Sequence, residues 1–168
     1  GATCSEFTSH VDIVPLLMTL AGGDNTWRTQ PQYAHLAGRA DLAALLGDPD
    51  AQGRDYIVHS SDEDLPEESF LTGVLPAPII AIIQRLGYPP SHVIGYRTKT
   101  AKLGIYSYFA QGSIQIMRQG QQAELYNYQA DGIGEVINRG PTGPAPDLPL
   151  AISMYNKLFN PTTGVVSY

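Results

Sequence analysis

Four histidines are the strongest candidates for acid–base chemistry or metal binding, and they stand as single residues along the first 92 positions. Two imidazoles reach one metal ion from helix positions i and i+4 or from a short loop, and no pair of these histidines has such spacing. The sequence therefore predicts no histidine-based metal site. The four residues are His10, His35, His59 and His92.

Two of the histidines are candidates for a place near a substrate. His59 lies at the end of a predicted buried strand beside Ser60 and Ser61, and functional residues concentrate where elements end in loops. The two serines lack the flanking glycines of a nucleophile elbow, so a serine hydrolase is not indicated. His10 precedes a predicted helix. It is expected either to lie near a substrate or to fix the preceding loop by hydrogen bonding.

Cations and carboxylates give two further patterns. Arg97 and Lys99 stand on a predicted strand and turn, where a cation at a pocket rim attracts an anionic group, although an ordinary charged strand surface has the same pattern. The acidic loop at residues 62–68 lacks the alternating ligands and turn glycine of a calcium loop, which favours a solvated surface. We take His59, Arg97 and His10 as substrate-proximal candidates and assign no catalytic or metal-binding residue.

Tyrosines are concentrated between residues 92 and 128. They would form either a platform for carbohydrate or cross-strand aromatic pairs, and the sequence supports both interpretations equally. They are Tyr96, Tyr106, Tyr108, Tyr126 and Tyr128.

Apolar spacing predicts the elements of the first half. A helix is expected over residues 12–21, with Ser9 or Asp12 as its N-cap and Gly22-Gly23 at its end, and Asp41 should open a short helix over 42–46. Residues 54–60 show little alternation, which predicts a central strand covered on both faces. A buried, isoleucine-rich helix is expected over 76–86.

From residue 92 to residue 128 the apolar period is two, which predicts a four-stranded antiparallel meander with turns near residues 99–101, 111–112 and 119–121. Residues 140–146 read as a linker, and Asp147 should cap a last amphipathic helix. The predicted fold class is α+β: a four-stranded antiparallel sheet packed against two or three helices.

Composition sets the outer bounds. The chain has 168 residues, 43% of them hydrophobic, which is enough for one real core without disulfides. A net charge of −6 without a basic cluster disfavours nucleic acid as a partner, and no apolar run approaches the length of a membrane helix. The single cysteine, Cys4, cannot form an internal disulfide.

Four segments, in order, resemble the late part of formylglycine-dependent sulfatases, which belong to the alkaline phosphatase/sulfatase superfamily. The first is Thr8 to Pro15 with Leu20-Ala21-Gly22, and the second is Leu36 to Arg39 with Leu42 and Leu45-Leu46. The third is Tyr96-Arg97-Thr98 to Lys102-Leu103, and the fourth runs from Glu124-Leu125-Tyr126 to Asn138. The chain departs from the family pattern at Leu16, Gly132, Asn127 and Tyr128.

The resemblance implies that residues 1–60 are the end of a sulfatase α/β core and that residues 61–168 are a C-terminal subdomain with the meander and the terminal helix. In such enzymes a formylglycine and a calcium ion act on the sulfate ester. Cys4 lacks the cysteine-x-proline-x-arginine motif, and an early paired-aspartate calcium motif is missing, so neither cofactor is expected on this chain. The implied partners are the N-terminal catalytic part of the same enzyme and a sulfated small molecule or sugar.

Three interpretations follow. The preferred one is an inactive C-terminal segment that supports the substrate side of a sulfatase cleft and exposes a large apolar patch, with self-association as a consequence. The second is a stand-alone binding or interaction module, which should be monomeric. The third is the corresponding segment of a phosphonate or phosphate ester hydrolase, which would differ in upstream residues.

Overall fold

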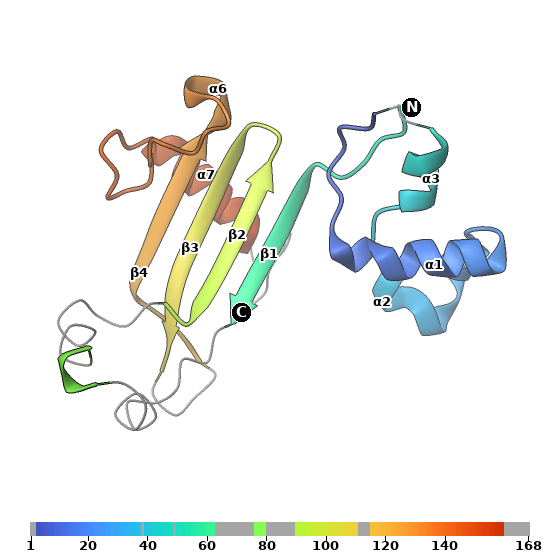
Figure 1. Cartoon of the computed structure of the whole chain (residues 1–168), viewed down its shortest axis with the longest axis horizontal. Coiled ribbons are helices and arrows are strands. Elements are labelled where there is room, and N and C mark those ends of the chain that lie inside the picture. Colours follow the sequence, from blue (N-terminus) through green and yellow to red (C-terminus); the bar gives the residue numbers. More distant parts are fainter. Residues whose placement is uncertain are drawn as a thin grey trace. The chain divides into compact units, whose positions relative to one another are not determined.

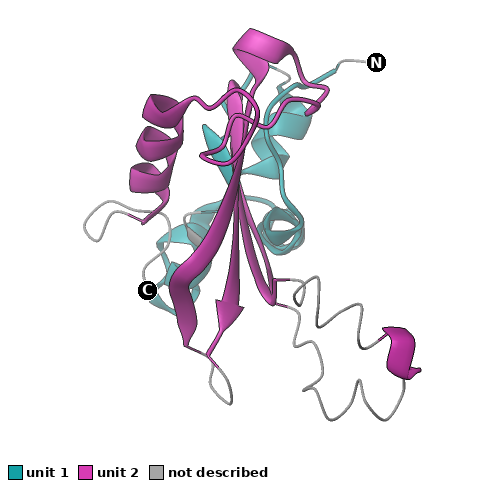
Figure 2. Cartoon of the chain, turned by 90° about the vertical axis from the view of Figure 1, so that its left-hand side faces the viewer, with its two compact units in different colours: residues 1–57 teal, residues 58–168 magenta. Residues whose placement is uncertain are grey.

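The computed structural model describes residues 3–37, 39–48, 50–62, 76–79, 90–110 and 115–159. It divides the chain into two compact units, residues 1–57 (unit 1) and residues 58–168 (unit 2), which Figure 2 colours separately. No helix among the described residues is long and apolar enough to cross a membrane.

Unit 1 consists of short helices. They are η1 (His10–Asp12), α1 (Ile13–Gly22), η2 (Thr26–Thr29), η3 (Pro31–Tyr33), α2 (Ala34–Ala37) and α3 (Leu42–Gly47). The predicted helix near the N-terminus is α1, and it ends at Gly23, whose φ of 78° requires the left-handed conformation that glycine adopts without strain. The predicted short helix is α3, and Asp41 caps it by accepting a hydrogen bond from the Ala44 amide at 3.0 Å.

Unit 2 contains a sheet, a C-terminal helix and a short connecting helix. The elements are β1 (Tyr56–Asp62, which begins at the end of unit 1), β2 (His92–Thr98), β3 (Ala101–Phe109), β4 (Ile116–Asn127), α6 (Tyr128–Asp131) and α7 (Leu148–Phe159). The strands lie in the order β1-β2-β3-β4, and consecutive strands run antiparallel (Figure 1). This confirms the predicted α+β fold class.

The core of unit 2 lies between the sheet and α7. Ile94, Leu103 and Leu125 are buried on one face of the sheet, and Ala151, Met154 and Leu158 of α7 cover them. The predicted cap of this helix is present, because Asp147 accepts a hydrogen bond from the Leu150 amide at 3.2 Å. Figure 2 shows α7 lying along this face of the sheet.

Two details of the sheet differ from the prediction. The strand expected as central and covered on both faces is β1, which lies at an edge of the sheet and has no fully buried residue. The turn expected at residues 119–121 is absent, since β4 continues through it as one strand. The range 92–128 therefore holds three described strands where four were predicted, and the fourth strand of the sheet is β1. Gly120 has a φ of 79° there, and the β3–β4 register shifts between Tyr106 and Tyr108, so the glycine belongs to an irregularity within paired strands.

Some predictions fall on residues that the structure does not describe. Most of the helix expected over 76–86 lies outside the described residues, as do the turn at 111–112 and the acidic loop after Asp62. The segment expected as a linker, residues 140–146, contains turns and bends between α6 and α7.

Candidate functional site

The sheet has a second face, opposite α7, that carries most of the polar chemistry of unit 2. Residues directly opposite each other on paired strands point to the same face. The register places Arg97, Lys102 and Tyr126 in one cross-strand row, and Gly95, Gly104 and Glu124 in the next. His59 belongs to this face, because its Cβ lies 4.0 Å from the position that a Cβ on Gly95 would occupy. We call this surface the open face: His59, Gly95, Arg97, Lys102, Gly104, Tyr106, Glu124 and Tyr126.

Glu124 is the acceptor for two tyrosines of the open face. The hydroxyls of Tyr106 and Tyr126 donate to the same carboxylate oxygen, Oε2, at 2.9 and 3.1 Å. Burial of the phenol and the hydrogen bond to Glu124 raise the pKa of Tyr106 to about 12, and the same causes raise the pKa of Tyr126. Both phenols therefore stay protonated and act as donors at neutral pH.

A second carboxylate, Glu135, closes one end of this face. It accepts a hydrogen bond from Lys102 Nζ at 2.6 Å and from the Tyr128 hydroxyl at 2.6 Å. The Lys102 hydrogen bond, followed by the one from Tyr128, lowers the pKa of Glu135, while burial and Glu135 raise that of Tyr128 to about 12. The guanidinium of Arg97 lies 5.3 Å from the centre of the Tyr128 ring.

The backbone of Glu135 is strained to make these contacts. Its φ of 51° is the one positive value recorded for a non-glycine residue among the described positions. Such a conformation costs free energy and persists where side-chain contacts hold it. The two hydrogen bonds of the Glu135 carboxylate supply that constraint.

The structure brings two of the three predicted substrate-proximal residues onto one surface. His59 of β1 and Arg97 of β2 both lie on the open face, and both are exposed. His10 is the first residue of η1 in unit 1 and is exposed there. Of the five tyrosines, Tyr96 is buried on the α7 side, whereas Tyr106 and Tyr126 lie on the open face.

Sequence analysis missed the two carboxylates at the centre of these contacts. The alternation of residues along β3 places Lys102, Gly104 and Tyr106 on a common face. Whether Glu124 of β4 lies beside them depends on the register between β3 and β4. Glu135 lies outside any strand and reaches Lys102 across 33 residues of sequence. The sulfatase-like segment 124–138 includes both carboxylates, but that resemblance gave neither of them a role in a site.

In unit 1 the dominant polar residue is Asp12, which is completely buried. Its carboxylate accepts hydrogen bonds from the Ser9 amide at 2.8 Å and the Ala40 amide at 3.0 Å, and it is paired with the Arg54 guanidinium. The sequence predicted Ser9 or Asp12 as the N-cap of α1, and Asp12 makes no side-chain cap hydrogen bond there. It instead links three segments of unit 1 through Ser9, Ala40 and Arg54. Asp12 is therefore a structural residue.

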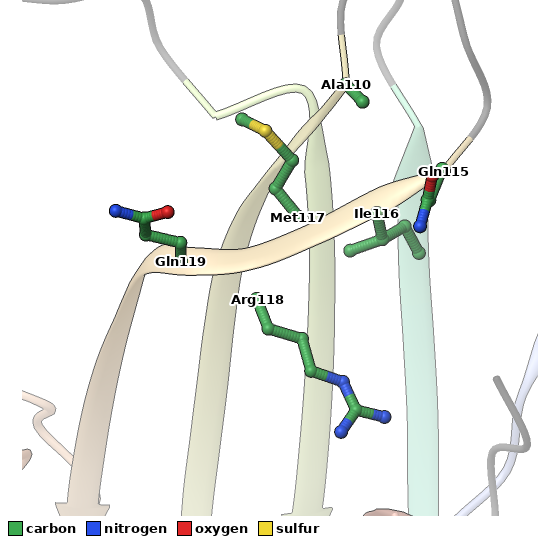
Figure 3. Close-up of a pocket in the computed structure, with 6 residues that line it drawn as sticks. All are labelled: Ala110, Gln115, Ile116, Met117, Arg118 and Gln119. Atoms are coloured by element: carbon green, nitrogen blue, oxygen red, sulfur yellow. The ribbon is translucent and has the colours of Figure 1, made fainter.

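His92 of β2, the fourth histidine, is buried, and its Nδ1 is paired with the exposed carboxylate of Asp62. No group of three or more His, Cys, Asp or Glu residues in the described part of the chain is arranged to hold a metal ion. A shallow hollow of about 420 Å³ lies at the start of β4, lined by Ala110, Gln115, Ile116, Met117, Arg118 and Gln119. Figure 3 shows Arg118 pointing away from Ala110 and Met117, and the lining contains no imidazole, thiol or carboxylate.

The chain matches no protein-family model and no curated protein sequence.

Proposed function

We propose that this chain is the C-terminal segment of a sulfate ester hydrolase, in which it supports the substrate side of the cleft. The catalytic residues, with the formylglycine and calcium that such enzymes use, would lie on the N-terminal part of the same enzyme. The proposal starts from the resemblance of residues 8–140 to sulfatases. One observation from the structure carries it further, namely the exposed apolar face of α1.

The helix α1 presents its hydrophobic side chains to solvent. Ile13, Leu17 and Leu20 are 50%, 58% and 65% exposed, and their spacing of four and three residues places them on one face. Val14 is 51% exposed beside them. A helix of a soluble domain normally buries such a stripe, so this face fits a surface made to be covered by another part of a larger protein.

In this proposal the N-terminal catalytic part covers α1, and the open face of unit 2 turns toward the substrate. Arg97 would provide positive charge and His59 an imidazole near the sulfate ester. None of the described residues is arranged as an activated nucleophile, and Cys4 is an exposed thiol. The chain's own contribution is therefore binding and positioning.

The first test is the reading frame that precedes residue 1. The proposal expects it to encode a cysteine-x-proline-x-arginine motif, and an upstream frame without that motif would overturn the proposal. The purified chain alone should release no product from an aryl sulfate ester, whereas the complete enzyme should do so. Faster turnover of an aryl phosphonate than of an aryl sulfate by the complete enzyme would reassign it to the phosphonate ester hydrolases.

The role of α1 is tested by a double variant, Leu17→Gln with Leu20→Gln. We expect co-purification with the separately expressed N-terminal part to fall at least about tenfold, because apolar area that drives the association is lost. The matched control is Leu148→Gln with Ile152→Gln on α7, whose side chains are 48% and 59% exposed. Equal loss in both double variants would contradict a specific role for α1, and a wild-type chain that stays monomeric and binds no N-terminal part would favour the stand-alone module.

A further inference from the structure

The centre of the open face contains two directly opposed glycines, which is an unusual choice for adjacent strand interiors. Gly95 of β2 pairs with Gly104 of β3. Glycine in a strand loses more conformational entropy on folding than other residues and packs no side chain, so it weakens the strand unless a ring, ligand or backbone must approach closely. The two positions differ in what fills the space above them.

The space above Gly104 is already occupied. A Cβ on Gly104 would lie 3.3 Å from both Cε2 and the hydroxyl oxygen of Tyr106. The Tyr106 ring therefore lies over this glycine and replaces the missing side chain. Gly104 is explained by packing within the protein.

The space above Gly95 is not filled in this way. Among the described residues, a Cβ there would meet the His59 carbonyl oxygen at 3.8 Å and the His59 Cβ at 4.0 Å, which is ordinary van der Waals contact. Its floor is the Gly95 backbone, the exposed His59 lies on one side, and the Tyr106 ring over Gly104 lies on the other. Nothing within the described part of unit 2 explains why this position lacks a side chain.

Two properties of the surrounding groups indicate the chemistry of a ligand. Glu124 binds both tyrosine hydroxyls through Oε2, and its Oε1 accepts no hydrogen bond from a described residue. That oxygen is therefore an acceptor for a ligand hydroxyl. Of the charged side chains defined as the open face, Glu124 accepts from two tyrosines, and Lys102 is paired with Glu135 beside the face. Arg97 lies in the next cross-strand row and not in the row of Gly95 and Gly104, so the position above Gly95 suits an uncharged ring.

We call the space above the Gly95 backbone, between His59 and the Tyr106 ring, the strip. We infer that this strip is a binding site for the ring of a neutral saccharide. The sugar's apolar C–H face lies against the Tyr106 ring, and its hydroxyls donate to Glu124 Oε1. This inference goes beyond the proposed function and does not depend on it, because the site is complete on unit 2 and binding is measurable with this chain alone.

The experiment is a binding screen of the purified chain against an array of neutral oligosaccharides and their sulfated counterparts, followed by titration calorimetry with the strongest binder. The expected result is a saturable complex with at least one of them. Absence of binding at millimolar sugar would overturn the inference. Binding confined to sulfated oligosaccharides and lost at high salt would also overturn it, because it would indicate an anion site.

Gly95→Val is the decisive variant. Valine favours strands, and a Cβ at this position makes only ordinary contacts with the described residues, so the variant should fold and should unfold at a temperature no lower than the wild type. Its isopropyl group fills the strip, and we expect sugar affinity to fall more than tenfold. A folded Gly95→Val chain that binds sugar like the wild type would place the site elsewhere and contradict the inference.

Two further variants complete the design. Glu124→Gln should weaken binding about tenfold, since a hydrogen bond to a charged acceptor becomes a neutral one. It also serves as the decisive variant if Gly95→Val fails to fold. Tyr155→Phe, on α7 and away from the open face, is the matched control and should leave affinity unchanged.

Discussion

The two units of this protein differ in the group that organises their interior, although both expose large apolar side chains, among them Val136 of unit 2 at 88%. Unit 1 buries a carboxylate, Asp12, and exposes the apolar face of α1. Unit 2 buries a continuous apolar core against α7 and leaves its carboxylates, Glu124 and Glu135, in a partly exposed network. Unit 2 is therefore organised around an apolar core, whereas the interior of unit 1 includes a buried charge held by hydrogen bonds and an ion pair.

The largest expected effect comes from removing the buried charge of unit 1. Asp12→Ala should destabilise unit 1 by about 3 kcal/mol, because Arg54 loses its partner and two amides lose their acceptor. Trp27 is the chain's single tryptophan and is buried in unit 1, so its fluorescence during denaturant unfolding reports the change. The exposed Asp24→Ala serves as control and should cost far less. If the unfolding transition followed by Trp27 fluorescence is unchanged in the Asp12→Ala variant, Asp12 does not stabilise unit 1.

A comparable loss is expected from the core of unit 2. Leu103 is 1% exposed beneath α7, and Leu103→Ala should cost about 3 kcal/mol through lost burial and the cavity left behind. Far-ultraviolet circular dichroism during thermal unfolding should show the earlier loss of the sheet. If the units are stabilised separately, the Trp27 transition stays where it is. A Trp27 transition that moves equally would show that the two units unfold together.

A smaller effect concerns the tyrosines of unit 2 at alkaline pH. The pKa of Tyr106 is raised from 10.0 to about 12, so its contribution to stability is complete below pH 10 and is lost as the pH rises toward 12. Absorbance at 295 nm should show phenols that ionise near pH 12, one of which disappears in Tyr106→Phe. The Tyr155→Phe chain should retain that late step. If the ionisation step near pH 12 keeps its full amplitude in the Tyr106→Phe variant, Tyr106 is not one of the phenols with a raised pKa.

The smallest effect is expected at Glu135. The Lys102 hydrogen bond lowers the pKa of this carboxylate below 4.5, so its stabilising contribution is present above that pH and is lost as the pH falls through the lowered value. Because the pair is partly exposed, Glu135→Gln should cost only about 0.5 kcal/mol at neutral pH. Acid titration of thermal stability should be shallower in the variant, and high salt should reduce the difference. Identical acid profiles would contradict this prediction.

Local patterns predicted several elements well, for reasons visible in particular residues. The apolar spacing of α1, the cap at Asp41 and the cap at Asp147 depend on residues a few positions apart, and all three are present. The period of two over 101–109 likewise separated the buried Leu103 from Lys102 and Tyr106 on the opposite face.

Other features depend on neighbours that the local sequence does not specify. The apolar run in β1 looked like a doubly covered strand, but its exposure follows from an edge position that only the strand order defines. Gly120 looked like a turn because a positive φ serves a turn and a strand irregularity equally well. Register across two strand pairs was needed to place Gly95, Gly104 and Glu124 in one row.

The amino-acid sequence by itself determined the kinds of element and the α+β class, because helix and strand periodicity and capping are local properties. Tertiary structure alone decided that Asp12 links three segments and that His59, Arg97 and Glu124 share one face. The physical reason is that hydrogen-bond partners and strand register are set by which distant segments pack together, a choice that no short stretch of sequence encodes.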